Sequence, residues 1–409
     1  MKSYRLIDIV DLIGGGTPKT NNSDYWGGNI PWISVKDLGC KGRYVKHTEK
    51  SITEAGLENS STRMLQEDDI VLSARGTVGE MAMLSGPMAF NQSCFGIRGK
   101  KEILDQTYLY YLLKNNLRRL KNHSYGSVFD TITRNTFADI EVTIPDISQQ
   151  KKVAGVLSRL DDKISLNENI NDYLMQAASA LYKAHFEEFT FPISSHDMIK
   201  SELGLIPKEA MVQTIGDIAE IIDCLHSKKP ERSSSGKPLL QLNNIGDNGD
   251  LDLYKEFLIS DSDYAKWIGR CEATAGDCVI TNVGRVGAVA QIPLDYKAAL
   301  GRNMTCIRCK GIFPYPSFML LTLISNRTRR EIDKNTDCGT ILSALNVKNI
   351  PKIRIVCFDP EKMELFEKMT RPLLWHVECT LAENIKLSAI RDSIIPGLLN
   401  GRTIIHAVK

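Results

Sequence analysis

The chain has 409 residues, of which 43% are hydrophobic and 24% are charged, and its formal net charge is only +2. This size allows two or three domains with cores of their own, and this composition excludes an intrinsically disordered chain. No apolar stretch approaches the roughly 18 residues needed to span a bilayer, and the N-terminal segment lacks the apolar centre of a signal peptide. We therefore expect a cytoplasmic protein.

The chain repeats itself with a period near 210 residues. Asp8 and Asp217 lie in similar segments, "LIDIVDLI" and "IGDIAEII". "EDDIVLSARGTVG" (67–79) matches "AGDCVITNVGRVG" (275–287) without a gap, and the segment at 126–148 matches the segment at 339–361. Three matches in the same order and at a nearly constant separation indicate an internal duplication.

The first copy begins with a mixed domain at residues 1–145. A polar, glycine-rich loop at 14–29 precedes short apolar or alternating segments at 30–35, 69–74 and 140–144, which predict strands. A segment at 104–120 between them predicts a helix. The second mixed domain, 211–358, follows the same plan after a linker at 191–210.

A long helix is predicted at 146–190, because one glycine and no proline interrupt it and because Asp146 or Ser148 can cap its first turn. Its apolar positions step by three and four residues, the spacing of a coiled-coil seam. The predicted seam residues are Val153, Leu157, Leu160, Ile164, Asn167, Asn171 and Leu174. Asparagines in the middle of such a seam fix its register.

A second long helix is predicted at 359–400, after Asp359 and Pro360, and a short tail follows at 401–409. Its seam residues are Met363, Phe366, Leu373, Val377 and Asn384. Pro372 should kink this helix. Two seams of similar length, separated by a globular domain, are expected to pack antiparallel, or each helix packs on its own domain. We therefore expect an α+β protein with two repeated mixed α/β domains separated by two long antiparallel coiled-coil helices.

Catalytic motifs are not found. "GGGTPKT" (14–20) lacks the Gly-Lys-[Ser/Thr] order of a phosphate loop, and no nucleotide-binding, zinc-protease or serine-hydrolase motif occurs. We expect no catalytic residues. Cys306 and Cys309 have the spacing of a metal-binding pair, with Cys271 and Cys278 as conceivable partners. Their segment alternates like a strand, which would turn the two thiols to opposite faces. We expect buried thiols and no metal, although the spacing leaves a metal possible.

Binding residues recur in both copies. Each copy has a basic cluster before a small-residue loop, and basic side chains of this kind neutralise DNA phosphates when they are not simply a solvated helix end. Each copy also has an arginine in a glycine-framed turn, which suits either a guanine edge or a nearby carboxylate. The candidate DNA-binding residues are Lys19, Thr20, Asn21, Arg75, Arg118, Arg119, Lys121, Tyr125, Ser127, Lys228, Lys229, Asn243, Arg285, Arg327, Arg329, Arg330 and Thr340.

The helix segments resemble those of a known family. Residues 143–186 resemble the central conserved helix of type I restriction–modification specificity subunits, with a glutamine-rich first turn, Leu160-Asp161-x-Lys163-Ile164, and an asparagine-rich middle. Residues 383–404 resemble the family's distal helix, and the Gly-x-Val-Gly turns at 76–79 and 284–287 fit its recognition domains. The resemblance covers essentially the whole chain.

The resemblance implies a non-catalytic subunit in which each recognition domain binds one half of a bipartite DNA target. It implies that the helices set the spacer and dock two methyltransferase subunits, and that motor–nuclease subunits join for cleavage. S-adenosylmethionine, ATP and magnesium would then belong to those partners. The alternative is a duplicated coiled-coil scaffold that binds proteins without DNA specificity.

Overall fold

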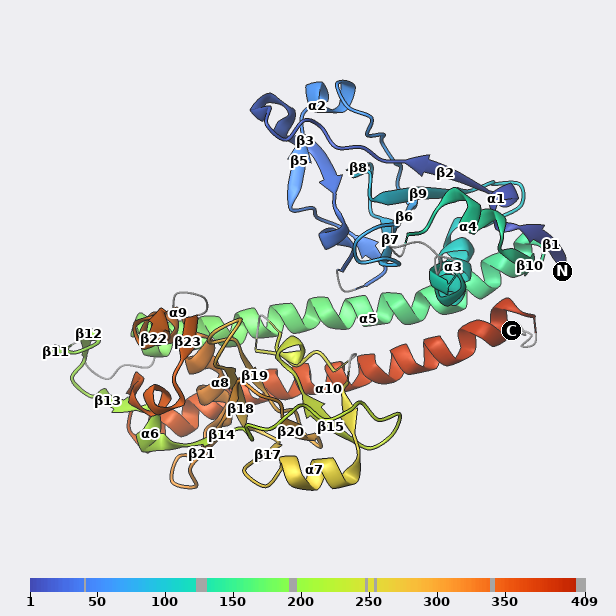
Figure 1. Cartoon of the computed structure of the whole chain (residues 1–409). Coiled ribbons are helices and arrows are strands. Elements are labelled where there is room, and N and C mark those ends of the chain that lie inside the picture. Colours follow the sequence, from blue (N-terminus) through green and yellow to red (C-terminus); the bar gives the residue numbers. More distant parts are fainter. Residues whose placement is uncertain are drawn as a thin grey trace. The chain divides into compact units, whose positions relative to one another are not determined.

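The computed structural model of the chain (Figure 1) describes residues 1–39, 42–122, 131–190, 197–246, 249–253, 256–338 and 343–401. The chain divides into two compact units. Unit 1 consists of Met1–Leu166 and Lys386–Lys409, and unit 2 consists of Asn167–Ile385. Two long helices, α5 (Ile147–Tyr182) and α10 (Pro360–Leu399), contribute residues to both units.

Domain 1, in unit 1, is built on a five-stranded sheet of order β2-β9-β6-β7-β4, with a three-stranded sheet β5-β3-β8 and the pair β1-β10. The strands are β1 (Lys2–Arg5), β2 (Val10–Gly14), β3 (Trp26–Ile33), β4 (Tyr44–Val45), β5 (Lys50–Ile52), β6 (Ile70–Ser73), β7 (Met81–Leu84), β8 (Ala89–Phe90), β9 (Cys94–Gly99) and β10 (Glu141–Ile144). The helices are α1 (Leu6–Ile9), α2 (Glu54–Glu58), α3 (Gln106–Asn122) and α4 (Arg134–Ala138). The strands predicted at 30–35, 69–74 and 140–144 correspond to β3, β6 and β10, and the helix predicted at 104–120 corresponds to α3.

Domain 2, in unit 2, has the sheets β14-β21-β18-β19 and β16-β15-β20-β17 and the pairs β13-β24 and β22-β23. Its strands are β13 (Met211–Thr214), β14 (Ala219–Asp223), β15 (Lys237–Leu240), β16 (Leu258–Ile259), β17 (Glu272–Thr274), β18 (Cys278–Thr281), β19 (Val289–Gln291), β20 (Lys297–Leu300), β21 (Met304–Cys309), β22 (Thr336–Cys338), β23 (Ser343–Leu345) and β24 (Arg354–Cys357). Its helices are α6 (Ile215–Ile218), α7 (Asp261–Trp267), α8 (Pro316–Ile324) and α9 (Asn326–Lys334).

The predicted duplication is confirmed in the strand register. In domain 1, β1 pairs antiparallel with β10 so that Lys2 lies opposite Ile144. In domain 2, β13 pairs antiparallel with β24 so that Met211 lies opposite Cys357. Each domain therefore begins and ends on one strand pair. The parallel pairs β3-β8 and β15-β20 and the antiparallel pairs β6-β9 and β18-β21 also correspond.

The core of domain 1 forms where α3 covers the sheet, because α3 buries Tyr108, Leu109, Tyr111 and Leu113 almost completely. In domain 2 the largely apolar α8 packs in the core and buries Phe318, Met319 and Leu321. A separate helix, α9, then carries the basic residues that the end of α3 carries in domain 1.

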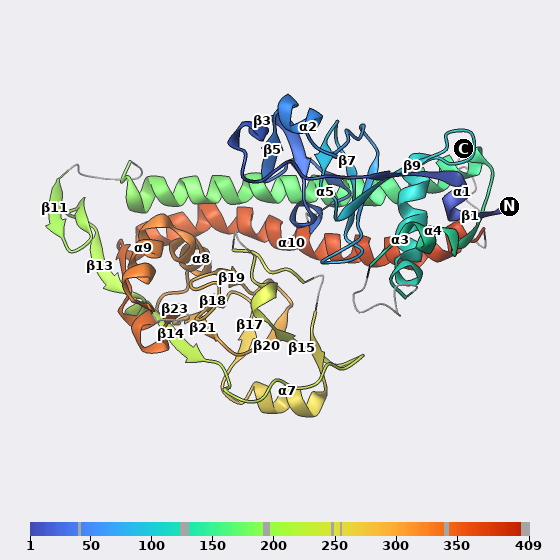
Figure 2. The same cartoon turned by 45° about the horizontal axis from the view of Figure 1, so that its top comes forward.

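The two long helices run antiparallel within each unit and lie side by side in both views (Figures 1 and 2). In unit 2, Asn167 of α5 meets Asn384 of α10, and Asn171 meets Thr380 four residues earlier in α10. In unit 1, Asp161 meets Arg391. Asp146 caps α5 by accepting a hydrogen bond from the Gln149 N–H at 3.0 Å.

Asp359 caps α10 by accepting a hydrogen bond from the Lys362 N–H at 3.1 Å. The helix continues through Pro372 without a break. The C-terminal end of α5 passes into one turn of π-helix at Lys183–Glu187. None of the helices among the described residues is both long and apolar enough to cross a membrane.

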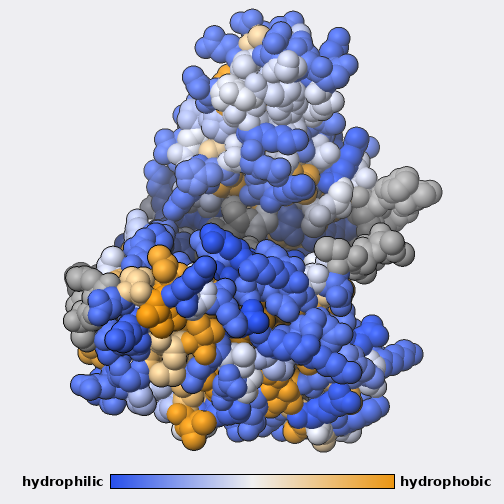
Figure 3. Space-filling model, turned by 90° about the vertical axis from the view of Figure 1, so that its left-hand side faces the viewer, coloured by the Kyte–Doolittle hydropathy of each residue, from blue (hydrophilic) through white to orange (hydrophobic). Residues whose placement is uncertain are grey.

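A hairpin of β11 (Met198–Ser201) and β12 (Gly204–Pro207) precedes domain 2 and exposes apolar side chains. Met198, Ile199 and Leu205 of the hairpin are each more than two-fifths exposed, as is Met211 at the start of β13. Figure 3 faces this side of unit 2, where apolar surface shows between hydrophilic areas.

Candidate nucleic-acid interface

A glycine turn between β6 and β7 is held by Ser73. The Ser73 hydroxyl donates to the Thr77 carbonyl at 2.6 Å and accepts from the Glu80 N–H at 2.8 Å. The Ser73 carbonyl accepts from the Gly79 N–H at 3.0 Å. Gly76 and Gly79 have φ angles of 79° and 89°, the left-handed region that favours glycine. The sequence 73–80 therefore forms a compact turn that closes on one hydroxyl.

The same turn lies between β18 and β19 in domain 2, where Thr281 replaces the serine. Its hydroxyl donates to the Arg285 carbonyl and accepts from the Ala288 N–H at 3.0 Å. The Gly287 N–H donates to the Thr281 carbonyl at 2.9 Å. Gly284 and Gly287 again have positive φ angles. In this alignment Arg285 corresponds to Thr77 and not to Arg75, so the two candidate arginines occupy different places in equivalent turns.

A basic side chain from the neighbouring helix crosses each turn at its last glycine. In domain 2, Arg329 of α9 donates from Nη1 to the Val286 carbonyl at 2.7 Å, and a Cβ on Gly287 would lie 2.7 Å from the same nitrogen. In domain 1, a Cβ on Gly79 would lie 2.1 Å from Cε of Lys121, at the end of α3. At both sites glycine leaves room for the cationic side chain over the backbone, and the positive φ angle itself favours glycine.

A partly buried ion pair that sequence reasoning missed lies at the start of the strand that leads into each turn. Arg98 of β9 binds Asp69 at 2.5 Å, and Arg308 of β21 binds Asp277 at 2.6 Å. The aspartate side chains are only 3% and 5% exposed. The hydrogen bond that Arg308 donates to Asp277 raises the pKa of Arg308, and the bond that Arg98 donates to Asp69 raises the pKa of Arg98. The separations of 208 and 210 residues between equivalent partners were the signal that could have revealed these pairs.

The opening loop of domain 1 meets the segment before β9. The Gly16 N–H donates to the Phe90 carbonyl at 3.0 Å, and the Thr17 hydroxyl bonds the Gln92 side chain. The next residue, Ser93, accepts a bond from the Arg75 N–H at 3.2 Å. The opening loop and the glycine turn thus contact one short segment. Lys19, Thr20, Asn21 and Arg75 are all exposed there.

The equivalent region of domain 2 is a hollow of about 740 Å³. It is lined by His226, Ser227, Lys228, Lys229, Arg302 and Asn303. The Asn303 carbonyl accepts from the Asn282 N–H at 2.8 Å, which ties this hollow to the second glycine turn. Lys229 lies with Nζ 4.1 Å from the centre of the Phe257 ring, a cation–π contact that holds the ammonium in place.

A second hollow of domain 2, of about 670 Å³, lies along the glycine turn itself. The lining residues include 284–289 of the turn, Asn326, Arg329 and Asp333 of α9, and Gly246. Arg285 donates to the Ile245 carbonyl at 2.7 Å, so its guanidinium is held against the domain. Arg329 approaches Asp333 at 3.3 Å.

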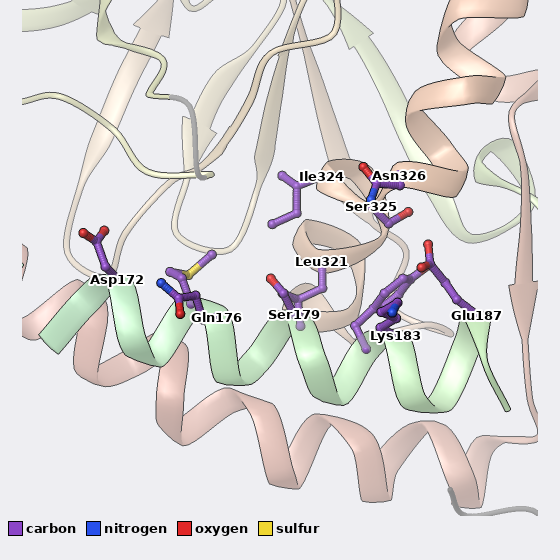
Figure 4. Close-up of a pocket in the computed structure, with 11 residues that line it drawn as sticks. Asp172, Gln176, Ser179, Lys183, Glu187, Leu321, Ile324, Ser325 and Asn326 are labelled. Carbon is purple, nitrogen blue, oxygen red and sulfur yellow. The ribbon is translucent and has the colours of Figure 1, made fainter. Parts of the chain in front are cut away.

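A third hollow, of about 520 Å³, lies between α5 and the α8–α9 region within unit 2 (Figure 4). Its charged side chains are Asp172, Lys183 and Glu187. Lys183 already pairs with Glu188 at 2.6 Å, which leaves this hollow acidic. It therefore does not suit a phosphate.

The chain is similar to proteins of known family. Residues 1–176 match the family described as "Type I restriction modification DNA specificity domain". This part of the chain is therefore similar to that family. The resemblance of the chain to type I specificity subunits is thereby confirmed.

Among curated relatives, the MjaIX specificity subunit of Methanocaldococcus jannaschii is 34% identical over 222 residues, which cover 53% of this chain and 51% of the relative. The HindI specificity subunit of Haemophilus influenzae is 23% identical, covering 72% of this chain and 76% of the relative. The chain spans about half the length of the first curated relatives it matches.

A crystal structure of the S subunit of a type I restriction–modification system from M. genitalium has a TM-score of 0.54 at 15% identity. The match covers 97% of this chain and 95% of that one. This likeness confirms the α+β fold class over nearly the full length.

Some candidate DNA-binding residues form hydrogen bonds within the chain that hold its elements together. Arg327 donates to the Phe186 and Glu187 carbonyls at 2.9 and 3.2 Å and lies over the Phe189 ring, so it secures the end of α5. Arg119 donates to Asn116 at 3.0 Å and to the Glu141 carbonyl at 3.3 Å.

The remaining candidates divide into exposed residues and residues outside the described ranges. Arg118, Asn243 and Arg330 are exposed. Arg118 and Arg330 form no ion pair with any residue that the structure describes. Tyr125, Ser127 and Thr340 lie outside the described residues.

The seam candidates lie along the contact between α5 and α10. Val153, Leu157, Ile164, Asn167, Asn171, Met363, Phe366, Val377 and Asn384 are buried. Leu160, Leu174 and Leu373 are half-buried, and the neighbouring Asp161 and Leu374 occupy the buried positions instead. A charged residue in the seam was missed because aspartate is almost never fully buried unless it is paired.

Cysteines do not form a cluster on β21. Cys306 packs in one core with Cys271, whereas Cys309 contacts the other core, to which Cys278 belongs. Among the described residues, one group offers three metal-ligand types together, namely Asp223, Cys224 and His226. Asp223 already binds His226 at 2.9 Å and approaches Arg270 at 3.5 Å, and the positive charge of Arg270 opposes a bound cation.

Proposed function

We propose that this chain is the DNA-specificity subunit of a type I restriction–modification complex. Each domain binds one half of a bipartite, asymmetric DNA target, and α5 and α10 set the spacer between the halves. The helices dock two methyltransferase subunits, and motor–nuclease subunits join for cleavage. The chain itself is non-catalytic and acts in the cytoplasm, and S-adenosylmethionine, ATP and magnesium bind to the partner subunits.

One observation carries this proposal. Both domains repeat the same glycine turn, crossed at its last glycine by a cationic side chain, Lys121 in one copy and Arg329 in the other. The glycine leaves room for the cation to lie against the turn, and a cation held there attracts a DNA phosphate. Two such surfaces in one chain suit a target with two separate halves. The family match of residues 1–176 supports the same conclusion for domain 1.

The test is to express this chain with its methyltransferase partners and to sequence the methylated bases of the host DNA. We expect one enriched motif with two specific segments and a fixed non-specific spacer. The matched control is a complex without this chain, which should leave the motif unmethylated. DNA that carries no enriched motif would reject the proposal.

The role of the helices needs a second experiment. Lengthening α5 and α10 together by whole turns between their seam asparagines and domain 2 should change the spacer and leave both specific segments unchanged. An unchanged spacer would reject the ruler role but not the recognition role.

A further inference from the structure

We propose that the hollow lined by residues 226–229 and 302–303 of domain 2 binds phosphate groups of the DNA backbone, and that domain 1 has no equivalent site. The inference rests on the proposed function and assigns one domain a task that the other lacks. Domain 2 would supply phosphate contacts in addition to those of the glycine turn that both domains share.

The cations of this hollow are available. Lys228, Lys229 and Arg302 are exposed, and Lys228 and Arg302 form no ion pair with any residue that the structure describes. Lys229 is oriented by the Phe257 ring, a contact that leaves its three N–H donors uncommitted to a carboxylate. Three positive groups around one concave surface favour a polyanion.

The nearby acidic and thiol groups do not cancel this charge. Asp223 and Glu231 are the acids that flank the hollow in sequence. Asp223 binds His226 at 2.9 Å and approaches Arg270 at 3.5 Å. Glu231 is exposed and is not among the residues that line the hollow. Burial raises the pKa of the adjacent Cys224 thiol, so that this group stays neutral. The hollow therefore keeps the charge of its lysines and arginine.

The backbone that carries these residues is fixed. Asn303 has a φ angle of 67°, and its carbonyl is bonded to the N–H of Asn282 at the end of β18. Arg270 also donates to the Cys224 carbonyl at 3.4 Å. The hollow is consequently held to the sheet before any ligand arrives, which reduces the ordering needed for binding.

Domain 1 differs at the equivalent positions. The strands β2 and β14 are separated by 209 residues, so Thr17, Lys19 and Thr20 correspond to His226, Lys228 and Lys229. The strands β9 and β21 are separated by 210 residues, so Gln92 corresponds to Arg302. One cation therefore stands where domain 2 has three. In addition, the Thr17 hydroxyl bonds the Gln92 side chain, so that two polar groups satisfy each other there.

The test is the salt dependence of DNA binding by the complete complex with its methyltransferase subunits. Each phosphate neutralised on B-DNA contributes about 0.9 to the slope of log affinity against log salt. The triple variant K228Q/K229Q/R302Q should reduce the magnitude of this slope by roughly 2 to 3. The decrease should be the same on the target duplex and on an unrelated duplex, because phosphates carry no sequence information.

Two variants serve as controls. K200Q/K208Q/K266Q removes the same charge from exposed positions on the β11–β12 hairpin, its following turn and α7, and should leave the slope nearly unchanged. K19Q in domain 1 should lower the slope by no more than about 1. All variants replace exposed side chains, so their thermal unfolding should match that of the wild type.

An unchanged slope in K228Q/K229Q/R302Q would overturn the phosphate site, as would an equal decrease in K200Q/K208Q/K266Q. These results leave the proposed function standing if the methylated motif persists. Conversely, a wild-type complex that methylates no enriched motif rejects the proposed function, while the slope on the unrelated duplex still tests the phosphate site.

Discussion

Arg391 of α10 donates a hydrogen bond from Nη1 to Oδ1 of Asp161 on α5, at 2.5 Å, within unit 1. The other oxygen of Asp161 accepts from the Tyr111 hydroxyl at 2.5 Å, so that one carboxylate joins α3, α5 and α10. The two side chains of the ion pair are only 13% and 6% exposed. A charge pair of this kind costs most when one partner is removed, because the other charge is left buried.

We predict that Arg391→Met lowers the free energy of unfolding of unit 1 by about 3 to 5 kcal/mol. Asp161→Asn combined with Arg391→Met should recover part of this loss, because the buried negative charge is then absent. Chemical denaturation measures both. Asp392→Asn is the control, since Asp392 is exposed and its substitution should change little. Equal losses in the single and double variants would contradict the prediction.

The buried asparagine pair of unit 2 leads to a second prediction. Asn167 donates from Nδ2 to Oδ1 of Asn384 at 2.8 Å and to the Glu383 carboxylate at 2.7 Å. Asn384→Leu should destabilise the chain by about 1 to 3 kcal/mol, because it leaves a buried amide with one partner fewer.

The double variant N167L/N384L should be more stable than N384L, because an apolar pair replaces two buried amides. Equilibrium unfolding in denaturant compares them. If N167L/N384L is less stable than N384L, the asparagines contribute more than register alone.

A third prediction concerns the second glycine turn. Gly287→Ala places a Cβ against Nη1 of Arg329 and requires a positive φ, which costs an alanine roughly 1 to 2 kcal/mol. We expect Gly287→Ala to weaken DNA binding and to lower methylation of the target. Only the recognition of one half of the target should change. Gly155→Ala is the matched control, because a Cβ there meets open space in α5 and should stabilise the helix by roughly 1 kcal/mol. Normal binding by Gly287→Ala would exclude a role for the turn.

A fourth prediction follows from His185 at the end of α5. Burial lowers the pKa of His185 below the ordinary value of 6.5, so that the folded chain favours the neutral ring. As pH falls below about 6.5 the unfolded chain binds more protons, and stability present above that pH is lost. His185→Phe, beside Phe186 and Phe366, should reduce this pH dependence.

Unfolding measured between about pH 7 and pH 5 tests this. The control is His376→Gln, because His376 is exposed on α10 and its substitution should leave the pH dependence as in the wild type. A His185→Phe variant that keeps the full pH dependence would show that other groups cause it.

The sequence predicted the duplication, the strands β3, β6 and β10, and both long helices, because these depend on local periodicity and on capping residues such as Asp146 and Asp359. It did not predict the roles of single charged residues. Arg327 lies in a basic cluster by sequence, but it bonds the end of α5, which is about 140 residues away along the chain. Leu160 fits the apolar spacing better than Asp161, yet the tertiary partners Arg391 and Tyr111 place Asp161 in the seam.

The candidate site was predicted in part. Glycine pairs and basic clusters are visible in a sequence, so Arg285, Lys228, Lys229 and Arg329 could be singled out. Arg302 was not, because no motif surrounds it and only the fold brings it to Lys228 and Lys229. Arg75 and Arg285 stand on opposite sides of a glycine in the repeated turn, and the hydrogen bonds of Ser73 and Thr281 align Arg285 with Thr77.

The pairing of the first and last strands in each domain has an evolutionary consequence. Because β1 pairs with β10 and β13 pairs with β24, the chain enters and leaves each domain at neighbouring points. A gene segment that encodes one domain can therefore be replaced by recombination without moving the ends of the helix to which it is joined. Because both copies begin and end on such a pair, the same reasoning applies to either domain, and under the proposed function exchange of a domain would change one half of the target.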